Sequence, residues 1–308
     1  MSSKNNQLDN KAKALAIIQG PIISYGQKTK NYCSDGFNVI NTIIKNIETL
    51  NKLNIIVVVS TWEPKGKNEK EIFNKLSKKI PKNNQIIYTK EPTFEDLSNR
   101  FKQQLSTING LKFFKKYPPQ TPTFKLRTDQ EYHKSIIEYC LKSNKKDYIV
   151  SEILDFPYYL GDFLHYSTYK NLENFFLKSI AWGNQTYIHP ATVQDLTIKN
   201  IIINNKFNQL LLKTIFGKLL ICILSVNKWS RECSRFHALP FNLYFKILWR
   251  GEKISDLIIN PPLLKKHDMS KVNSSNIERI KFIIKLIKNF FELYLQIVLP
   301  KKIKAFKF

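Results

Sequence analysis

A run of five consecutive β-branched residues, Ile55 to Val59, limits the folds open to this chain more than any other feature. A strand with one face in solvent alternates apolar and polar side chains, whereas a strand buried on both faces is apolar throughout. Strands of the second kind belong to parallel sheets that carry helices on both faces. The run ends in Ser60, Thr61 and Trp62, so we expect a buried strand with polar and aromatic groups at its carboxyl end.

Segments with strand and helix patterns alternate along the first half of the chain. Short apolar runs predict strands, and apolar residues spaced three and four apart predict helices. This alternation predicts an α/β domain with a Rossmann-like, mostly parallel sheet over roughly the first half. The expected elements are strands at 14–18, 54–60, 85–89, 124–129 and 148–153, with helices at 36–50, 67–79 and 96–114 between them.

The second half is rich in aromatic residues and lysine, with helical periodicity and few strand signals. From 277 to 299, apolar residues recur at helical spacing with Lys and Arg between them. We interpret this stretch as a C-terminal helix packed on its own domain, with interfacial binding to an anionic membrane as the alternative. The predicted organisation is a flexible N-terminus (1–13), an α/β domain (14–200) and a mainly helical, basic C-terminal region (201–308).

The chain is strongly basic, with 49 Lys and Arg against 24 Asp and Glu and a net charge of +25. Such a surplus attracts nucleic acid, anionic lipid or phosphorylated substrates. The abundance of Lys, Asn and Ile is explained equally well by an AT-rich genome. Because the basic residues are spread along the chain and no nucleic-acid module is present, nucleic-acid binding is the less favoured alternative.

The four cysteines, at positions 33, 140, 222 and 233, show no metal-ligand spacing. This pattern fits a reducing cytoplasm and argues against a zinc site or a disulfide scaffold. The longest apolar stretch, 210–226, contains Lys213 and Lys218, which favours a buried helix over a membrane span. We therefore expect a cytoplasmic protein, with contact at the inner face of the plasma membrane as the further option.

Polar side chains follow three of the expected strands. Ligands of open α/β sheets bind just outside the carboxyl ends of the strands, so these residues are candidates for a binding site. Glycine allows close approach of a ligand to the backbone, and tryptophan stacks on a base or a sugar ring or, alternatively, covers the sheet edge. The residues are Gln19, Gly20 and Pro21 after the first strand, Thr61 and Trp62 after the second, and Lys125, Arg127 and Asp129 on one face of a later strand.

The expected helix at 96–114 carries a second polar set. Asn99, Gln103, Ser106 and Gly110 recur at spacings of four, three and four, so they share one face. A polar face is costly to bury without partners. It therefore faces either solvent or a ligand cleft.

Together these segments resemble the WavE-type lipopolysaccharide-synthesis family, glycosyltransferases of bacterial surface polysaccharides. The resemblance rests on 19–22, 60–62, 99–111 and 125–129, continues through 161–166 and 171–172, and so covers about residues 14 to 176. It implies a GT-A-like fold and transfer of a sugar from a nucleotide-sugar donor to a polysaccharide or lipopolysaccharide precursor, either a glycan or a lipid-linked acceptor. The helix face 99–110 then lines the cleft.

Glycosyl transfer needs charge neutralisation of the diphosphate, a base for the acceptor hydroxyl in inverting chemistry, and a fitted pocket. The resemblance implies that Arg127 and Lys125 offset the diphosphate charge, that Asp129 binds the sugar or a divalent metal (Mn²⁺ or Mg²⁺), and that Asp162 is the base. Many GT-A enzymes have Asp-x-Asp where this chain has Arg127-Thr128-Asp129, so a metal has only a lone carboxylate here.

Two further alternatives remain open at this stage. Asp162 also suits the N-cap of a helix starting near Phe163. A glycan-binding relative without catalysis would explain the missing first Asp. The remaining candidates for donor binding are Gln19, Gly20, Pro21, Thr61, Trp62, Asn99 and Gln103.

Overall fold

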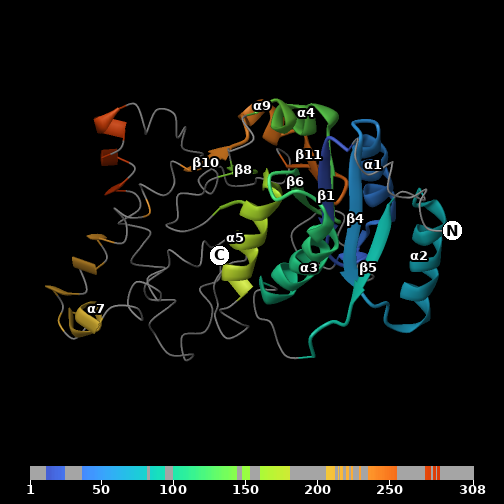
Figure 1. Ribbon diagram of the computed structural model, residues 1–308, viewed down its shortest axis with the longest axis horizontal. Helices are drawn as coiled ribbons and strands as arrows, with labels where there is room; N and C mark the ends of the chain where they lie inside the picture. The colour runs from blue at the N-terminus through green and yellow to red at the C-terminus, as the bar shows by residue number, and fades with distance from the viewer. Residues whose placement is uncertain are drawn as a thin grey trace.

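The computed structural model describes most of the first 180 residues and parts of the remainder (Figure 1). The described ranges are 12–24, 37–81, 84–93, 100–143, 148–152, 160–180, 206–211 and 235–254, with short pieces at 214, 216–217, 220–221, 223–224, 229, 275–278, 280–281 and 283–284.

A seven-stranded sheet forms the centre of the described structure, in the order β10-β8-β9-β6-β1-β4-β5. Neighbouring strands run parallel except β9, which is antiparallel to both β6 and β8. The predicted α/β fold with a mostly parallel sheet is therefore confirmed. The strands are β1 (Ala14–Gln19), β4 (Ile55–Trp62), β5 (Gln85–Thr89), β6 (Pro122–Arg127), β8 (Tyr148–Val150), β9 (His165–Thr168) and β10 (Phe236–Ala238).

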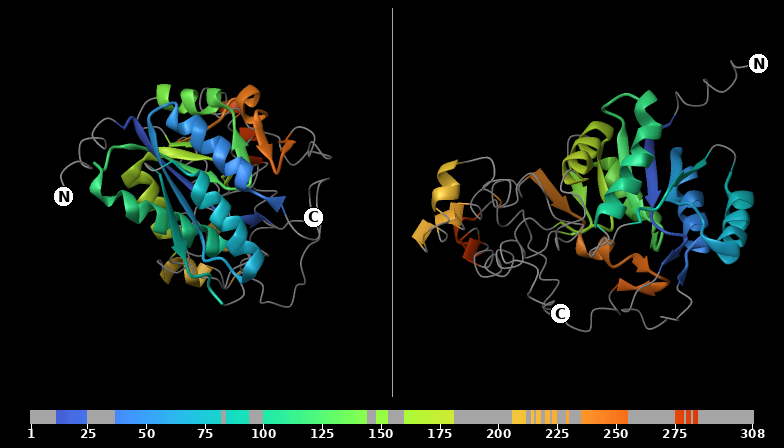
Figure 2. Two further views of the ribbon diagram at one scale, coloured as in Figure 1. Left: turned by 90° about the vertical axis from the view of Figure 1, so that its right-hand side faces the viewer. Right: turned by 90° about the horizontal axis from the view of Figure 1, so that it is seen from below.

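Helices cover both faces of this sheet (Figure 2). The even-numbered residues of β1, such as Ala16 and Ile18, pack in one apolar cluster with α1, α2 and α4. The opposite face carries α3 and α5, and Gly110 of α3 lies directly against Ile17. The helices are α1 (Ile40–Asn51), α2 (Gly66–Lys79), α3 (Arg100–Phe113), α4 (Lys134–Lys142), α5 (Tyr169–Ile180), α7 (Lys206–Leu211) and α9 (Phe241–Tyr244), with a 3-10 turn at Phe114–Lys116.

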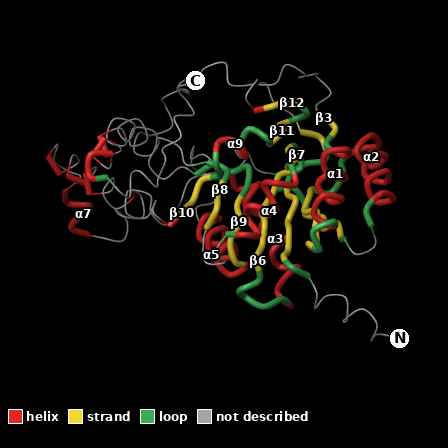
Figure 3. The backbone as a smooth tube through the Cα atoms, turned by 90° about the horizontal axis from the view of Figure 1, so that it is seen from above, coloured by secondary structure: helices red, strands yellow, loops and turns green. Residues whose placement is uncertain are grey.

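Two small sheets lie beside the main one. Figure 3 shows β7, β11 and β12 together beyond the end of β6. This placement follows from chain order, because β7 begins three residues after β6 ends. The strands of the small sheets are β7 (Gln130–Tyr132), β11 (Ile247–Trp249) and β12 (Glu252–Lys253) in one, and β2 (Ile23–Ser24) and β3 (Phe37–Asn38) in the other.

Several predicted boundaries need correction. The helix expected at 36–50 begins at Ile40, because Phe37 and Asn38 pair with β2. The strand expected at 124–129 ends at Arg127, and Asp129 lies in the turn into β7. The buried strand at 54–60 continues to Trp62, and the strands expected at 14–18 and 85–89 and the helix at 67–79 lie within one residue of their predicted bounds. The start of the helix at 96–114 (residues 96–99) and Ile153 lie outside the described residues.

The second half contains strands that the sequence did not predict. β10 adds to the main sheet beside β8, beyond the predicted boundary at residue 200, which itself stays a prediction. β10 and β11 have three residues and β12 has two, too few for alternation to show. In the stretch 277–299, Ile277, Ile280 and Ile284 are exposed by 66%, 56% and 61%, whereas Ile283 is half-buried, and the interpretation of this stretch as a packed helix stays a prediction. In the described part of the chain, no helix has the length and apolarity for a membrane crossing.

Candidate functional site

The candidate site lies where the strand order reverses. From β1 the chain adds β4 and β5 on one side, then crosses to place β6 on the other side of β1. Such a switch point opens a crevice at the carboxyl ends of the two strands. The register aligns Gln19 of β1 with Ser60 of β4 and with Arg127 of β6, so the three predicted segments meet at one level of the sheet.

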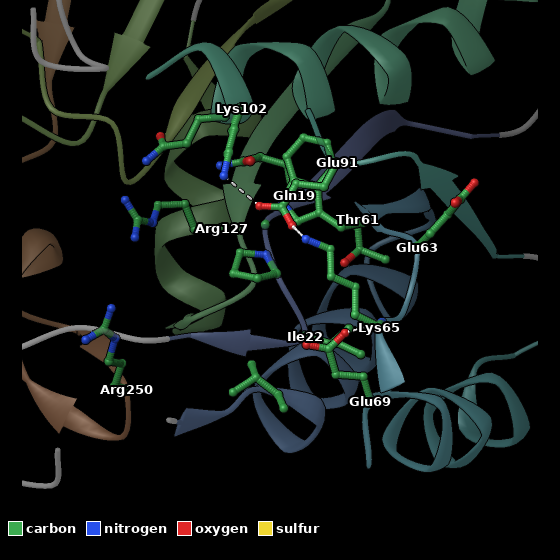
Figure 4. A pocket seen from close by; sticks show the side chains of 15 residues that line it. Gln19, Ile22, Thr61, Glu63, Lys65, Glu69, Glu91, Lys102, Arg127 and Arg250 are labelled. Carbon is green, nitrogen blue, oxygen red and sulfur yellow. Dashed lines mark hydrogen bonds and ion pairs between the residues drawn. The ribbon is translucent and has the colours of Figure 1, made fainter. Parts of the chain in front are cut away.

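A pocket of about 410 Å³ occupies this crevice (Figure 4). Ligand pockets for small molecules have volumes of about 300–1,000 Å³, so this pocket is in the range of small-molecule sites. The structure brings most of the predicted donor-binding residues together in its wall. The lining residues are Gln19, Gly20, Pro21, Ile22, Ile23, Thr61, Trp62, Glu63, Lys65, Glu69, Glu91, Lys102, Gln103, Arg127 and Arg250.

The polar face of α3 packs against the carboxyl edge of the sheet. The hydroxyl of Ser106 donates to Oε1 of Gln19 at 2.8 Å, and the hydroxyl of Ser60 donates to the carbonyl oxygen of Ser106 at 2.6 Å. Gly110 allows this approach, because a Cβ there would lie 2.6 Å from Cγ2 of Ile17. At Ser106 and Gly110 this face therefore packs against the sheet, and faces neither solvent nor the pocket. Gln103 reaches the pocket, and Asn99 lies outside the described residues.

Gly20 connects the turn after β1 to the turn after β6. Its φ of +138° is a conformation that side chains with a Cβ rarely adopt, and a Cβ there would lie 2.4 Å from Oγ1 of Thr128. The hydroxyl of Thr128 donates to the carbonyl oxygen of Pro21 at 2.9 Å, and its amide donates to the carbonyl oxygen of Gln19 at 3.0 Å. The glycine is thus needed for packing between the two turns as well as for the pocket surface.

Arg127 links two carboxylates at the pocket wall. Its Nε and Nη2 donate to Oδ1 and Oδ2 of Asp129 at 2.9 and 3.0 Å, and its Nη1 donates to Oδ2 of Asp162 at 2.8 Å. Burial acts to lower the pKa of Arg127, but the two carboxylates outweigh burial and raise it above its usual value. Phe163 covers the guanidinium, with Cζ of Arg127 at 5.7 Å from the ring centre. Arg127 is therefore a fixed, permanently charged cation.

Asp129 is engaged on both of its oxygens. Besides the Arg127 bonds, Oδ2 accepts from the indole Nε1 of Trp249 at 3.0 Å and lies 3.5 Å from Nε of Arg250. Burial alone would raise the pKa of Asp129, but Arg127, Trp249 and Arg250 lower it to about 2. The side chain is 3% exposed and does not line the pocket. Asp129 is therefore placed to hold the guanidinium groups of Arg127 and Arg250 in position.

The residues around Asp129 do not fit a divalent metal. Mg²⁺ and Mn²⁺ take several oxygen ligands, whereas both oxygens of Asp129 already bond to nitrogen donors. Among the described residues, no group of three or more His, Cys, Asp or Glu side chains is placed to hold a metal ion.

Asp162 lies in the loop before β9, a strand, so the helix N-cap alternative is wrong. Its carboxylate reaches Arg127, while its backbone carbonyl oxygen accepts a hydrogen bond from Nζ of Lys125. Lys125 is buried below the pocket wall and does not line it, so it does not face a diphosphate there. Burial lowers the pKa of Lys125 to about 8, and burial together with the Lys125 charge lowers that of His165 to about 3.

The opposite wall carries charges that the sequence did not single out. Glu91 accepts from Nζ of Lys102 at 2.7 Å and also forms an ion pair with Lys65. The amide of Lys65 donates to Glu69 at 2.5 Å. Deeper in the pocket wall, the buried hydroxyl of Thr61 has no hydrogen-bond partner within the described part of the chain.

Most of the pocket residues that were not predicted have no distinctive pattern in the sequence around them. Lys65 and Glu91 stand in polar connecting segments that resemble any surface loop. Lys102 is the exception, since it directly precedes Gln103 on the helix already implicated. Trp249 and Arg250 come from a short hairpin more than a hundred residues away from Asp129, and only pairing of β11 with β7 brings them to the site.

No family model and no curated protein matches the chain, so the resemblance to the WavE-type family stays a prediction. Similar solved structures include a nucleotide-diphospho-sugar transferase from Desulfovibrio desulfuricans G20 (11% identity, 89% of this chain and 98% of that chain, TM-score 0.36). Another is a mannosyltransferase from Pyrobaculum calidifontis, in complex with GDP-Man and Mn²⁺ (9% identity, 91% of this chain and 88% of that chain, TM-score 0.35). A third is the 4-diphosphocytidyl-2C-methyl-D-erythritol synthase from Anaerococcus prevotii DSM 20548 (15% identity, 67% of this chain and 99% of that chain, TM-score 0.33).

Proposed function

We propose that this chain is a glycosyltransferase that moves a sugar from a nucleotide-sugar donor to a surface polysaccharide or lipopolysaccharide precursor. The observation that carries the proposal is the pocket at the switch point of the sheet, with the fixed cation Arg127 in its wall. The choice of acceptor rests on the family resemblance of residues 14 to 176.

The donor binds with its diphosphate against Arg127. A guanidinium meets phosphate oxygens through paired N–H bonds, and three of the five N–H donors of Arg127 already bond to Asp129 and Asp162. These bonds fix the position of the guanidinium before a ligand arrives, so little ordering is needed on binding. Trp62 and Gln103 line the same pocket and supply a ring face and an amide for the base or the sugar.

Arg127 neutralises the charge of the diphosphate in place of a metal ion. The leaving diphosphate develops negative charge, which a preorganised cation in a partly buried site stabilises. Because the surroundings of Asp129 do not fit Mg²⁺ or Mn²⁺, donor binding is expected to persist in a chelator.

Asp162 is the proposed base for the acceptor hydroxyl. It does not itself line the pocket, but its Oδ2 accepts from Arg127, which does, and it comes from the loop before β9, on the β6 side of the switch point. A carboxylate can accept the acceptor proton in inverting chemistry, provided the second oxygen reaches the hydroxyl.

The C-terminal stretch is proposed to contact anionic membrane lipid. Three exposed isoleucines, Ile277, Ile280 and Ile284, recur at helical spacing, and the exposed Lys281 lies among them. An apolar face next to lysines suits the boundary of an anionic leaflet.

The test is release of nucleoside diphosphate from UDP-, GDP- and dTDP-sugars, with release of CMP from CMP-sugars measured in parallel. A glycan acceptor mixture is added to the full-length protein. Release with one donor that falls by about a hundredfold in Asp162→Asn supports the proposal, since general-base catalysis contributes about 10²–10⁴-fold.

The matched control is Glu131→Gln, which removes a carboxylate on β7 that pairs with the exposed Lys45 and does not line the pocket. The control is expected to keep wild-type activity. Donor binding without any nucleotide release would instead identify a glycan-binding relative without catalysis.

A further inference from the structure

We propose that Arg250 is a second phosphate-binding residue of the pocket, and that Asp129 holds Arg127 and Arg250 as a pair that receives the two phosphates of a nucleoside diphosphate. This inference rests on the proposed donor pocket and adds a residue from the C-terminal half of the chain, outside the resemblance at 14–176. Arg250 lines the pocket on the same side as Arg127 (Figure 4).

The hairpin between β11 and β12 presents Arg250 in a fixed position. Trp249 pairs with Glu252, so Arg250 and Gly251 form a two-residue turn. Both have positive φ, +52° and +83°, which is the geometry of a type I′ hairpin turn. Asn is common at the first of these positions and arginine is not. A non-glycine residue in this conformation at a pocket wall is a pointer to function.

Three contacts attach this turn to the end of β6. The amide of Arg250 donates to the carbonyl oxygen of Asp129 at 2.8 Å, and Trp249 pairs with Gln130 across the β11–β7 ladder. The indole of Trp249 donates to Oδ2 of Asp129 at 3.0 Å. The hairpin is therefore positioned by the same residue that positions Arg127.

One carboxylate thus orients two guanidinium groups. Asp129 lies 2.9 Å from Nε of Arg127 and 3.5 Å from Nε of Arg250. The guanidinium of Arg250 also lies 5.2 Å from the ring centre of Trp249, and its side chain is almost fully buried. Asp129 and Asp162 together balance the charges of Arg127 and Arg250, and planar guanidinium groups match phosphate oxygens in pairs.

Two neighbouring guanidinium groups match a ligand with two linked phosphates better than a ligand with one. A nucleoside diphosphate engages both arginines, whereas a nucleoside monophosphate engages a single one. We therefore expect Arg250 to select for the diphosphate.

The experiment measures dissociation constants by calorimetry for UDP, GDP, CDP and dTDP, for the corresponding monophosphates and for inorganic pyrophosphate. It uses the full chain with EDTA present. The main variant is Arg250→Asn, because Asn-Gly is a favoured type I′ turn and should preserve the hairpin. The control is Lys253→Gln, which removes a positive charge from the same hairpin at an exposed position that does not line the pocket.

The expected result is a loss of about tenfold or more in affinity for the diphosphate and for pyrophosphate in Arg250→Asn, as for one lost charge-assisted contact. Monophosphate affinity should change by less than about twofold, and Lys253→Gln should bind like wild type. Arg250→Lys should also lose the preference for diphosphate, because an ammonium is a point charge without a planar fork.

Wild-type diphosphate affinity in a folded Arg250→Asn would overturn the role of Arg250 while leaving the donor pocket in place. Equal losses for diphosphate and monophosphate would also overturn it, because the effect would then not depend on the second phosphate. Failure of the folded wild-type protein to bind any of these ligands would overturn both the inference and the proposed function. Melting temperatures within a few degrees of wild type establish that each variant is folded.

Discussion

The side chains of Arg127 and Asp129 form a bidentate pair at the end of β6, with Nε–Oδ1 and Nη2–Oδ2 distances of 2.9 and 3.0 Å. The pair turns both oxygens of the carboxylate toward nitrogen donors. Asp129 therefore holds the Arg127 guanidinium in place at the pocket wall. It does not act as a ligand for a metal ion from solution.

Removal of the Arg127 guanidinium should destabilise the protein strongly. Arg127→Gln leaves Asp129 and Asp162 without their main counter-charge in a buried site, and loss of one partner of a buried ion pair typically costs about 3–5 kcal/mol. Urea unfolding monitored by circular dichroism measures the change. Lys45→Gln, which breaks an exposed pair with Glu131, should cost less than about 1 kcal/mol. A loss of less than about 1 kcal/mol in Arg127→Gln would contradict a stabilising role for the ion pairs of Arg127 with Asp129 and Asp162.

The Asp129 carboxylate should contribute to acid sensitivity in a defined window. Its pKa is lowered from 3.8 to about 2, so the unfolded chain binds a proton before the folded protein does. The corresponding stabilisation, about 2 kcal/mol, is present above about pH 4 and is lost as pH falls toward 2.

The measurement is the free energy of unfolding against pH for the wild type and for Asp129→Asn, which cannot titrate. The variant should be less stable at pH 7 and should lose less stability between about pH 4 and 2. Parallel curves for the two proteins in that window would show that Asp129 titrates normally.

Gly20 should tolerate no Cβ. Gly20→Ala places a methyl group 2.4 Å from Oγ1 of Thr128 at a φ of +138°, so we expect destabilisation by more than about 1 kcal/mol and weaker ligand binding. Gly66→Ala is the matched comparison, because Gly66 also has a positive φ, +71°, but open space around its Cβ. Partial rescue of Gly20→Ala by Thr128→Ala would confirm the steric part of the effect, and equal costs in the two glycine variants would contradict it.

The exposed isoleucines of the C-terminal stretch should promote binding to anionic membranes. The full chain should float with vesicles of phosphatidylglycerol and phosphatidylcholine, and less so as salt rises. Replacement of Ile277, Ile280 and Ile284 by serine should reduce membrane affinity by more than about tenfold, since each buried apolar side chain contributes about 1.5–3 kcal/mol. Unchanged flotation of this variant would show that the three isoleucines do not contact the membrane. The control is Leu177→Ser, which replaces an exposed leucine of α5 and should leave flotation unchanged.

The central sheet could be predicted because its signals are local. The β-branched run of β4 and the apolar spacing in α1 depend on residues close to each other in sequence. The strand-end positions of Gln19, Thr61 and Arg127 followed from that order, and the structure places them around one pocket.

The role of Asp129 could not be predicted, because it depends on pairing between distant segments. The sequence shows Arg127 and Asp129 two residues apart but does not show that Trp249 and Arg250 reach the same carboxylate through the β11–β7 ladder. Lys125 alternates onto the same face as Arg127, as predicted, yet it is buried and does not line the pocket, and its Nζ donates a hydrogen bond to the carbonyl oxygen of Asp162.

The most direct test of the central claim is calorimetric titration of the full chain with UDP-, GDP-, CMP- and dTDP-sugars in the presence of EDTA. The account predicts saturable binding of one nucleotide class without metal, strongly reduced in a folded Arg127→Lys variant, because a lysine cannot replace the bidentate guanidinium. A ligand at about a hundred times its dissociation constant should add roughly 2.7 kcal/mol to the unfolding free energy, which gives an independent check by melting temperature. Binding that requires Mn²⁺ or Mg²⁺, or no binding by the folded wild-type protein, would contradict it.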